Sequence, residues 1–158
     1  KPIEPDKLHT ILEAGMSGPC AVNAREWAFI VVTDREKLAQ MAEANGRVAR
    51  MLNQAAAAIL VCGDLDRAFP PAPDFWVIDA AIAAQNMTLA ANDLGIGSVW
   101  LGTWPDEKRV KRQATIFQLP ETIVPHSILA LGYPAEDIDM RAVRPSRYEE
   151  NRVHVNQW

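Results

Sequence analysis

The sequence has little of what several common protein classes require. Only two of its 158 residues are cysteine, Cys20 and Cys62, and neither belongs to a CxxC pair or stands close to a histidine. A disulfide scaffold and a zinc module are therefore excluded as leading interpretations, and two isolated cysteines fit a reducing, cytoplasmic location. No uninterrupted apolar run reaches the roughly 18 residues that a membrane-spanning helix needs, so we expect no membrane partner.

The motifs of side-chain catalysis are also missing. The sequence has no GxSxG nucleophile elbow and no Walker A lysine. Gly95 and Gly97 lack the third glycine of a dinucleotide-binding fingerprint and would follow a helix rather than a strand. Nothing in the sequence supports a nucleophilic pair between Cys20 and one of the three histidines. Because the sequence has so few reactive motifs, it favours an enzyme whose cofactor carries the reaction. We predict no catalytic side chain and no metal ligand.

Charge is distributed unevenly along the chain. The 16 basic and 20 acidic residues give a net charge of −4, and an acidic chain is a poor partner for nucleic acid, whose binding depends on many phosphate contacts. Residues 141–158 are instead rich in arginine. The charged residues there are Arg141, Arg144, Arg147, Arg152, Glu149 and Glu150. The cluster suits one anionic ligand, although a solvated tail is the plainer interpretation.

Hydrophobic periodicity predicts interleaved helices and strands. Helices are expected over 5–14, after the capping residue Asp34, over 74–94 and over 106–115; strands are expected over 27–33, 58–62, 98–101 and 127–131. Such interleaving predicts an α+β or α/β class. Because no internal repeat or linker interrupts the pattern, we expect a single domain over residues 1–158.

The expected helix 74–94 is apolar on most sides, which predicts burial. One narrow face holds small and polar residues at spacings of four and three: Asp79, Ala83, Asn86, Ala90 and Asp93. Small residues allow another segment to approach closely. That segment could come from the same chain or from a second subunit, and the pattern alone does not decide between them.

Three segments suit a flat, anionic cofactor. Residues 18–23 (GPCAVN) predict a tight turn with free backbone N–H groups and an amide side chain. Residues 95–102 (GIGSVWLG) include small residues, which allow the backbone to approach a flat ligand closely. The arginine cluster is suited to a phosphate group.

These segments, taken in order, resemble the FMN-dependent nitroreductase family. Residues 1–14 look like its first helix, 18–27 like its P-S-x-x-N-x-Q-P-W segment, and 79–102 like its central helix and the following strand. Residues 131–134 look like its G-Y-P strand end, and 147–158 like its C-terminal segment. Each motif alone is weak, but their order extends over nearly the whole chain.

The resemblance implies an α+β, nitroreductase-like fold in which helices flank a mainly antiparallel central sheet and a long central helix is buried. It implies an FMN-dependent oxidoreductase with NAD(P)H as co-substrate, which reduces nitroaromatic or quinone-like small molecules by two electrons in a ping-pong scheme. It also implies a homodimer with its active sites at the interface, and so favours the subunit-interface interpretation of the 79–93 face.

The resemblance also assigns cofactor-binding residues. The flavin would be lined by Pro19, Cys20 and Asn23, and by Leu101 and Gly102, whose backbone N–H would lie near flavin N5. The phosphate would be bound by Arg147, with Arg144 as a second candidate, and Arg50 falls near another polar contact region. Trp27 and Trp100 are expected in the core, whereas Phe69, Phe75, Trp76 and Trp104 could either border the substrate pocket or be buried.

The sequence departs from the family pattern in three places. The family's R-R-S-x-R segment would precede Lys1, and we expect it upstream because the chain opens without methionine. Cys20 replaces a serine, and Arg25 and Glu26 replace a Gln-Pro pair. Two alternatives therefore stay open: a flavin-binding or regulatory protein without turnover, and a family relative with a dedicated substrate.

Overall fold

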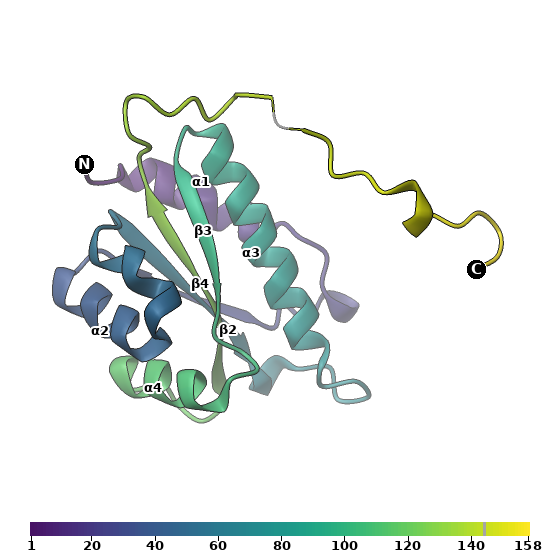
Figure 1. Ribbon diagram of the computed structural model, residues 1–158. Coiled ribbons are helices and arrows are strands. Elements are labelled where there is room, and N and C mark those ends of the chain that lie inside the picture. The colour runs from purple at the N-terminus through teal and green to yellow at the C-terminus, as the bar shows by residue number, and fades with distance from the viewer. Residues whose placement is uncertain (144) are drawn as a thin grey trace.

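The computed structural model describes residues 1–143 and 145–158, and within them four strands form one antiparallel sheet (Figure 1). The strand order is β1-β2-β4-β3. The strands are β1 (Trp27–Val32), β2 (Ala57–Asp64), β3 (Gly97–Gly102) and β4 (Ile123–Gly132). Every pairing is antiparallel, which confirms the α+β class and excludes the α/β alternative.

In the part of the chain that the structure describes, four α-helices surround the sheet: α1 (Pro5–Met16), α2 (Arg35–Asn45), α3 (Phe75–Asp93) and α4 (Glu107–Phe117). Short 3₁₀ helices lie at η1 (Ala21–Asn23), η2 (Arg47–Asn53), η3 (Leu65–Arg67) and η4 (Glu150–Arg152). Asp34 caps α2 as predicted, since its carboxylate accepts a hydrogen bond from Lys37 N at 2.8 Å. Asp74 precedes α3, but among the described residues its side chain accepts no capping hydrogen bond.

The two faces of the sheet are covered by different helices. Ile59 and Leu129 belong to the core beneath α1 and α3, whereas Leu60 and Ile128 belong to the core beneath α2 and α4. Cys62 lies in the second core, where burial raises the pKa of its thiol to about 12. Because β2 and β4 are covered on both faces, their hydrophobic runs are continuous rather than alternating.

Helix α3 is the long buried helix that the resemblance implied. Its 19 residues extend for about 28 Å beside α1 and across the sheet (Figure 1). Trp76 in its first turn lies directly on β2: a Cβ added to Gly63 would be 2.2 Å from Trp76 Cε3. Gly63 therefore provides the space that the indole ring occupies.

The small and polar face of α3 packs within the chain. Asp79 Oδ2 accepts a hydrogen bond from Ala21 N at 2.9 Å, and Asn86 Nδ2 donates one to Ala14 O at 3.3 Å. Ala83 is buried against α1, and Asp93 is exposed. Close approach within the same chain is therefore shown for Asp79, Ala83 and Asn86, which face α1 and η1. A part of this face in a subunit interface stays a prediction. The apolar residues that α3 does expose are Phe75, Ile78 and Leu89.

The segment after β4 leaves the sheet. Figure 1 shows it passing the end of α3 and finishing away from the strands. Its residues from 145 to 158 are exposed. Within the described residues, no helix is both long and apolar enough to cross a membrane.

Candidate functional site

Strand β3 lies at the edge of the sheet and pairs with β4. Thr103 N and Trp104 N both donate to His126 O, at 3.2 and 2.9 Å, in a bulge that ends the pairing. Residues of an antiparallel strand alternate between facing the partner and facing away. Since Thr103 faces β4, the backbone N–H and C=O of Gly102 face the open edge. A backbone donor is therefore directed out of the sheet at Gly102.

The Gly102 carbonyl is held by two side chains from outside the strand. Asn45 Nδ2 donates to Gly102 O at 3.2 Å, and Arg109 Nη1 donates to the same oxygen at 3.1 Å. Asn45 Oδ1 accepts in turn from Thr103 Oγ1 at 3.0 Å, and both of these side chains are buried. Asp106 orients the guanidinium through Arg109 Nε at 3.3 Å. This network holds the Gly102 carbonyl, which belongs to the peptide between Gly102 and Thr103.

Aromatic rings surround the same strand end. The Trp100 ring lies 3.8 Å from the position that a Cβ on Gly102 would take. Trp100 meets His126 edge to face with 5.7 Å between centroids, and Trp76 meets Trp104 in the same way at 5.1 Å. Trp100 is 43% exposed, so its predicted place in the core is wrong, because β3 is an edge strand. Trp76 is buried and Trp104 is exposed. The place of Trp104 at a substrate pocket stays a prediction.

His126 is the buried histidine of this cluster. Burial lowers the pKa of its imidazole to about 4, so the ring is neutral near pH 7. Its Nδ1 lies 3.1 Å from Ser127 Oγ. A neutral, enclosed ring supports the packing of Trp76 and Trp100 rather than the transfer of a proton at this pH.

The loop of residues 17–25, which contains η1 and is here called the η1 loop, presents the predicted residues Pro19, Cys20 and Asn23. Pro19 and Asn23 are exposed, and Cys20 is half-buried. Asn23 Oδ1 accepts from Arg25 Nε at 3.3 Å, and Cys20 Sγ accepts from Arg25 N at 3.4 Å. Three non-glycine residues with positive φ give the loop its shape; they are Val22, Asn23 and Arg25. The bond from Ala21 N to Asp79 ties this strained backbone to α3.

Glu26 is a buried carboxyl between this loop and residues 64–73. Its Oε1 accepts from Phe69 N at 2.7 Å, while Oε2 has no partner among the described residues. Burial raises the pKa of Glu26 above its ordinary value, and the nearby Asp79 carboxyl adds to the rise. Glu26 therefore anchors the proline-rich loop at a cost in desolvation.

We expect Glu26→Gln to raise the free energy of unfolding at pH 7 by on the order of 1 kcal/mol. The folded protein holds the Glu26 proton more tightly than the unfolded chain does. Ionisation therefore costs stability as the pH rises above about 4.5, the ordinary pKa. Urea denaturation at pH 7 and pH 4 measures the gain, which should vanish at pH 4. Glu13→Gln, on the exposed face of α1, is the matched control, and an equal gain at both pH values would contradict the explanation.

Comparison with known proteins adds the deciding observation. Residues 1–61 and 47–133 match the family described as the nitroreductase family. This chain belongs to the nitroreductase family. A relative from Methanothermobacter thermautotrophicus, which carries the provisional name NADH dehydrogenase/NAD(P)H nitroreductase, is 42% identical over 151 residues. Those residues are 96% of this chain and 75% of the relative.

Solved structures share this fold. A structure from Clostridium acetobutylicum with the provisional name NADH oxidase has a TM-score of 0.91 and 33% identity, and the match covers 100% of this chain and 92% of that one. A protein described as an FMN-dependent nitroreductase from Clostridium difficile has a TM-score of 0.87 and 29% identity, with 100% and 91% covered. The resemblance noted from the motifs and the nitroreductase-like fold are both confirmed.

The other residues predicted from the family are dispersed in one chain. Figure 1 shows α3 between the η1 loop and β3, the two elements that carry most of the predicted flavin-lining residues. The Leu101 side chain is buried beneath α2 and α4, which leaves its backbone for a ligand. Arg50 is exposed on η2, and Arg147 is exposed in the segment after β4. Arg144 lies outside the described residues.

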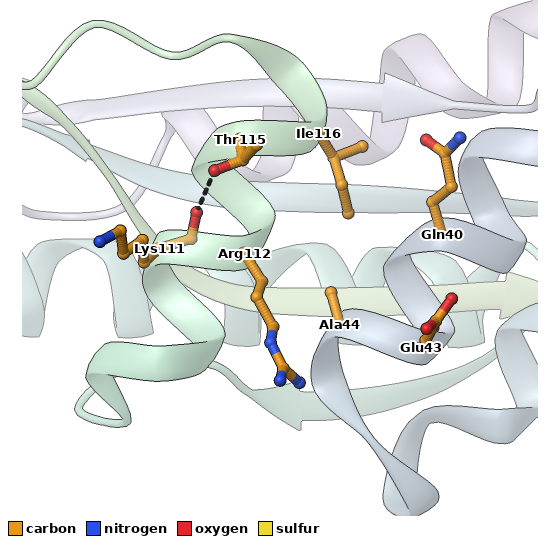
Figure 2. A pocket seen from close by; sticks show the side chains of 7 residues that line it. All are labelled: Gln40, Glu43, Ala44, Lys111, Arg112, Thr115 and Ile116. Atoms are coloured by element: carbon orange, nitrogen blue, oxygen red, sulfur yellow. Dashed lines mark hydrogen bonds between the residues drawn. The ribbon is translucent and has the colours of Figure 1, made fainter.

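A separate groove of about 520 Å³ lies between α2 and α4 (Figure 2). Its lining residues are Gln40, Glu43, Ala44, Lys111, Arg112, Thr115 and Ile116. None of these seven is a residue predicted to bind the flavin. In Figure 2, Thr115 Oγ1 donates to Lys111 O at 2.8 Å, which pairs the hydroxyl within its own helix. The groove therefore adds nothing to the site at β3.

Asn45 and Arg109 are the residues of this site that the sequence did not predict. Asn45 is the last residue of α2 and is followed by Gly46, so in the sequence it looks like an ordinary helix end. Arg109 lies in a helix rich in charge, where one arginine does not stand out. Only the fold brings these two side chains to the end of β3.

Proposed function

We propose that this member of the nitroreductase family is an FMN-dependent NAD(P)H oxidoreductase that reduces nitroaromatic or quinone-like acceptors. The observation that carries the proposal is the Gly102 N–H, fixed at the open edge of β3 beside the exposed face of Trp100. It lies in a chain similar throughout its length to a protein described as an FMN-dependent nitroreductase. Residues 1–158 would then form one FMN-binding domain.

The residues present fit FMN in three respects. The isoalloxazine ring is flat, and Gly102 carries no side chain that would cover the backbone beside Trp100. Ring nitrogens accept hydrogen bonds, and the Gly102 N–H is a donor directed away from the sheet. The phosphate is anionic, and the guanidinium groups of Arg147 and Arg50 are exposed.

Bound FMN would supply the reaction by accepting a hydride from NAD(P)H and giving two electrons to the acceptor. The chain would orient the ring through Gly102 N–H near flavin N5 and through Pro19, Cys20 and Asn23 of the η1 loop. Trp100 and Trp104 would exclude water and present flat apolar surface to an aromatic acceptor. A ping-pong scheme follows, because donor and acceptor would use the same exposed face in turn.

We further propose a homodimer whose two sites are built from both protomers. The η1 loop and the end of β3 lie on opposite sides of α3 (Figure 1), so a second copy would bring one to the other. The apolar side chains that α3 exposes, Phe75, Ile78 and Leu89, supply surface that a partner would cover. Sedimentation of the purified protein tests this, and a monomer at micromolar concentration would contradict it.

The activity is tested with the complete natural chain. Purified protein incubated with FMN should quench flavin fluorescence and oxidise NADH or NADPH when a nitroaromatic or a quinone is added. Double-reciprocal plots at several acceptor concentrations should be parallel. A flavin-loaded protein that neither nicotinamide reduces would favour the alternative of a binding protein without turnover, for which the replacement of serine by Cys20 is the motivating feature.

We expect Arg147→Ala to weaken FMN binding by about 10- to 100-fold. Loss of one charge-assisted contact to phosphate costs roughly 1.5–3 kcal/mol, which corresponds to that range. Titration of flavin fluorescence measures the dissociation constant. Arg152→Ala is the matched control, because Arg152 Nε is already paired with Glu149 Oε2 at 2.9 Å. If both variants weakened FMN binding equally, the loss would reflect the overall positive charge of the segment. That result would contradict the assignment of Arg147 to the phosphate.

A further inference from the structure

We propose that Asn45 and Arg109 are positioning residues that hold the Gly102 N–H in line with flavin N5 and thereby set the reduction potential of the flavin. The inference rests on the proposed function, since it needs FMN at the end of β3. It concerns two side chains that contact neither the η1 loop nor the arginine-rich segment in any of the hydrogen bonds described above. Their connection to the flavin would run through the backbone of Gly102.

The N–H of Gly102 belongs to the peptide before it, and the C=O belongs to the peptide after it. In an extended strand these two groups point to the same side, so side chains that hold the carbonyl restrict rotation about the Gly102 backbone bonds that join the two peptides. Asn45 bonds to the carbonyl of Gly102 and to the hydroxyl of Thr103, at 3.2 and 3.0 Å. Arg109 adds the third bond at 3.1 Å. The peptide that follows Gly102 is thus held at its carbonyl by Asn45 and Arg109, and at its N–H by His126 O, which lies 3.2 Å from Thr103 N.

Among the described residues, the side-chain amide of Asn45 hydrogen-bonds only to Gly102 and Thr103. Helix α2 already ends through its backbone, because Gly46 N donates to Ala42 O and Glu43 O at 3.0 and 3.2 Å. A fully buried amide is costly unless it is paired, and the groups that pair Asn45 belong to Gly102 and Thr103. Burial of this polar side chain therefore stabilises one particular backbone orientation at the end of β3.

That orientation has a chemical consequence for a flavin. In the oxidised ring, N5 carries a lone pair that accepts a hydrogen bond. After two-electron reduction N5 carries a hydrogen and faces the N–H as a second donor. A rigid N–H therefore favours the oxidised form over the reduced form. Loosening the Gly102 peptide should lessen this preference and raise the two-electron potential.

The test measures the two-electron midpoint potential of FMN-loaded protein by anaerobic titration against a reference dye. We expect Asn45→Leu and Arg109→Met each to favour the reduced flavin about tenfold more than wild type does, a rise of about 30 mV for a two-electron couple. Arg109→Lys should recover part of the difference, because it keeps a cationic donor. Since Arg109 is partly exposed, Arg109→Met decides the question if Asn45→Leu does not fold.

Gln113 provides the matched control. It is equally buried, and its Nε2 donates to Met41 O at 3.0 Å between α4 and α2. Gln113→Met should lower stability while leaving the potential at the wild-type value. FMN-loaded Asn45→Leu or Arg109→Met with an unchanged potential would overturn the inference and leave the proposed function standing. A wild-type protein that binds no FMN would overturn both.

Discussion

Gly63→Ala is expected to lower the free energy of unfolding by about 3 kcal/mol, the upper end of the range for an overpacked core. The added methyl group would lie 2.2 Å from Cε3 and 2.7 Å from Cδ2 of Trp76, inside the van der Waals contact of a rigid ring. Strand β2 cannot yield, because Gly63 is paired with Trp27 on one side and Val124 on the other. Chemical denaturation followed by tryptophan fluorescence measures the loss.

Two further variants separate this contact from a general effect of alanine in a strand. Gly132→Ala should change stability by no more than about 0.5 kcal/mol, because its nearest neighbour would be Ala56 N at an ordinary 3.8 Å. In a Trp76→Leu background, the penalty of Gly63→Ala should shrink, since the two changes share one contact. A full penalty in that background would show that the clash is not with the indole.

Stability should fall by about 3 kcal/mol as the pH is lowered from above 6.5 towards 4, through His126 alone. The unfolded chain binds a proton at this imidazole with the ordinary pKa of 6.5, whereas burial lowers the folded pKa to about 4. Between these values the unfolded state binds more protons, so acid favours unfolding. The contribution is complete above pH 6.5 and is lost as the pH falls to about 4.

Urea denaturation between pH 4 and pH 8 measures this dependence, and His126→Gln should flatten it across that window. His9→Gln is the control, because His9 lies on the exposed face of α1 beside Glu13. A dependence of equal slope in His126→Gln would mean that another group titrates in this range. Protonation of His126 would also disturb the edge-to-face contacts of its ring with Trp100 and Trp76. The packing of these two tryptophan rings should therefore loosen as stability is lost.

The hydrophobic patterns located every strand and main helix. They did not predict where β4 begins. The sequence predicted a strand over 127–131, and β4 begins earlier, at Ile123, and contains Pro125. Proline is tolerated there because β3 is paired with β4 only from Ser127 onward, so Pro125 faces an edge with its missing N–H. A local pattern carries no information on where a neighbouring strand stops.

The same limit applies to Trp100 and to the face of α3. A tryptophan within a short apolar strand predicts burial, and only the order of strands reveals that β3 is an edge. Small residues at helical spacing predict close packing, but not that Ala14 and Ala21 of the same chain provide it.

For the site, the family motifs located the Gly102 peptide and the η1 loop, and their roles toward a flavin stay predictions. The side chains that hold Gly102 come from the end of α2 and the start of α4, which are distant in sequence from each other and from the family's motifs. Asn45 and Arg109 acquire their significance only when the chain folds.

The exposed edge of β3 has a consequence for solubility. Unpaired backbone groups along an edge strand can recruit a strand from another molecule and start aggregation. Here the strand has six residues, and the carbonyl at its end is already occupied by Asn45 and Arg109. An incoming strand would find only a short stretch between Ser98 and Gly102 open to pairing. The two side chains that orient the Gly102 peptide thereby also protect the protein from growing its sheet beyond β3.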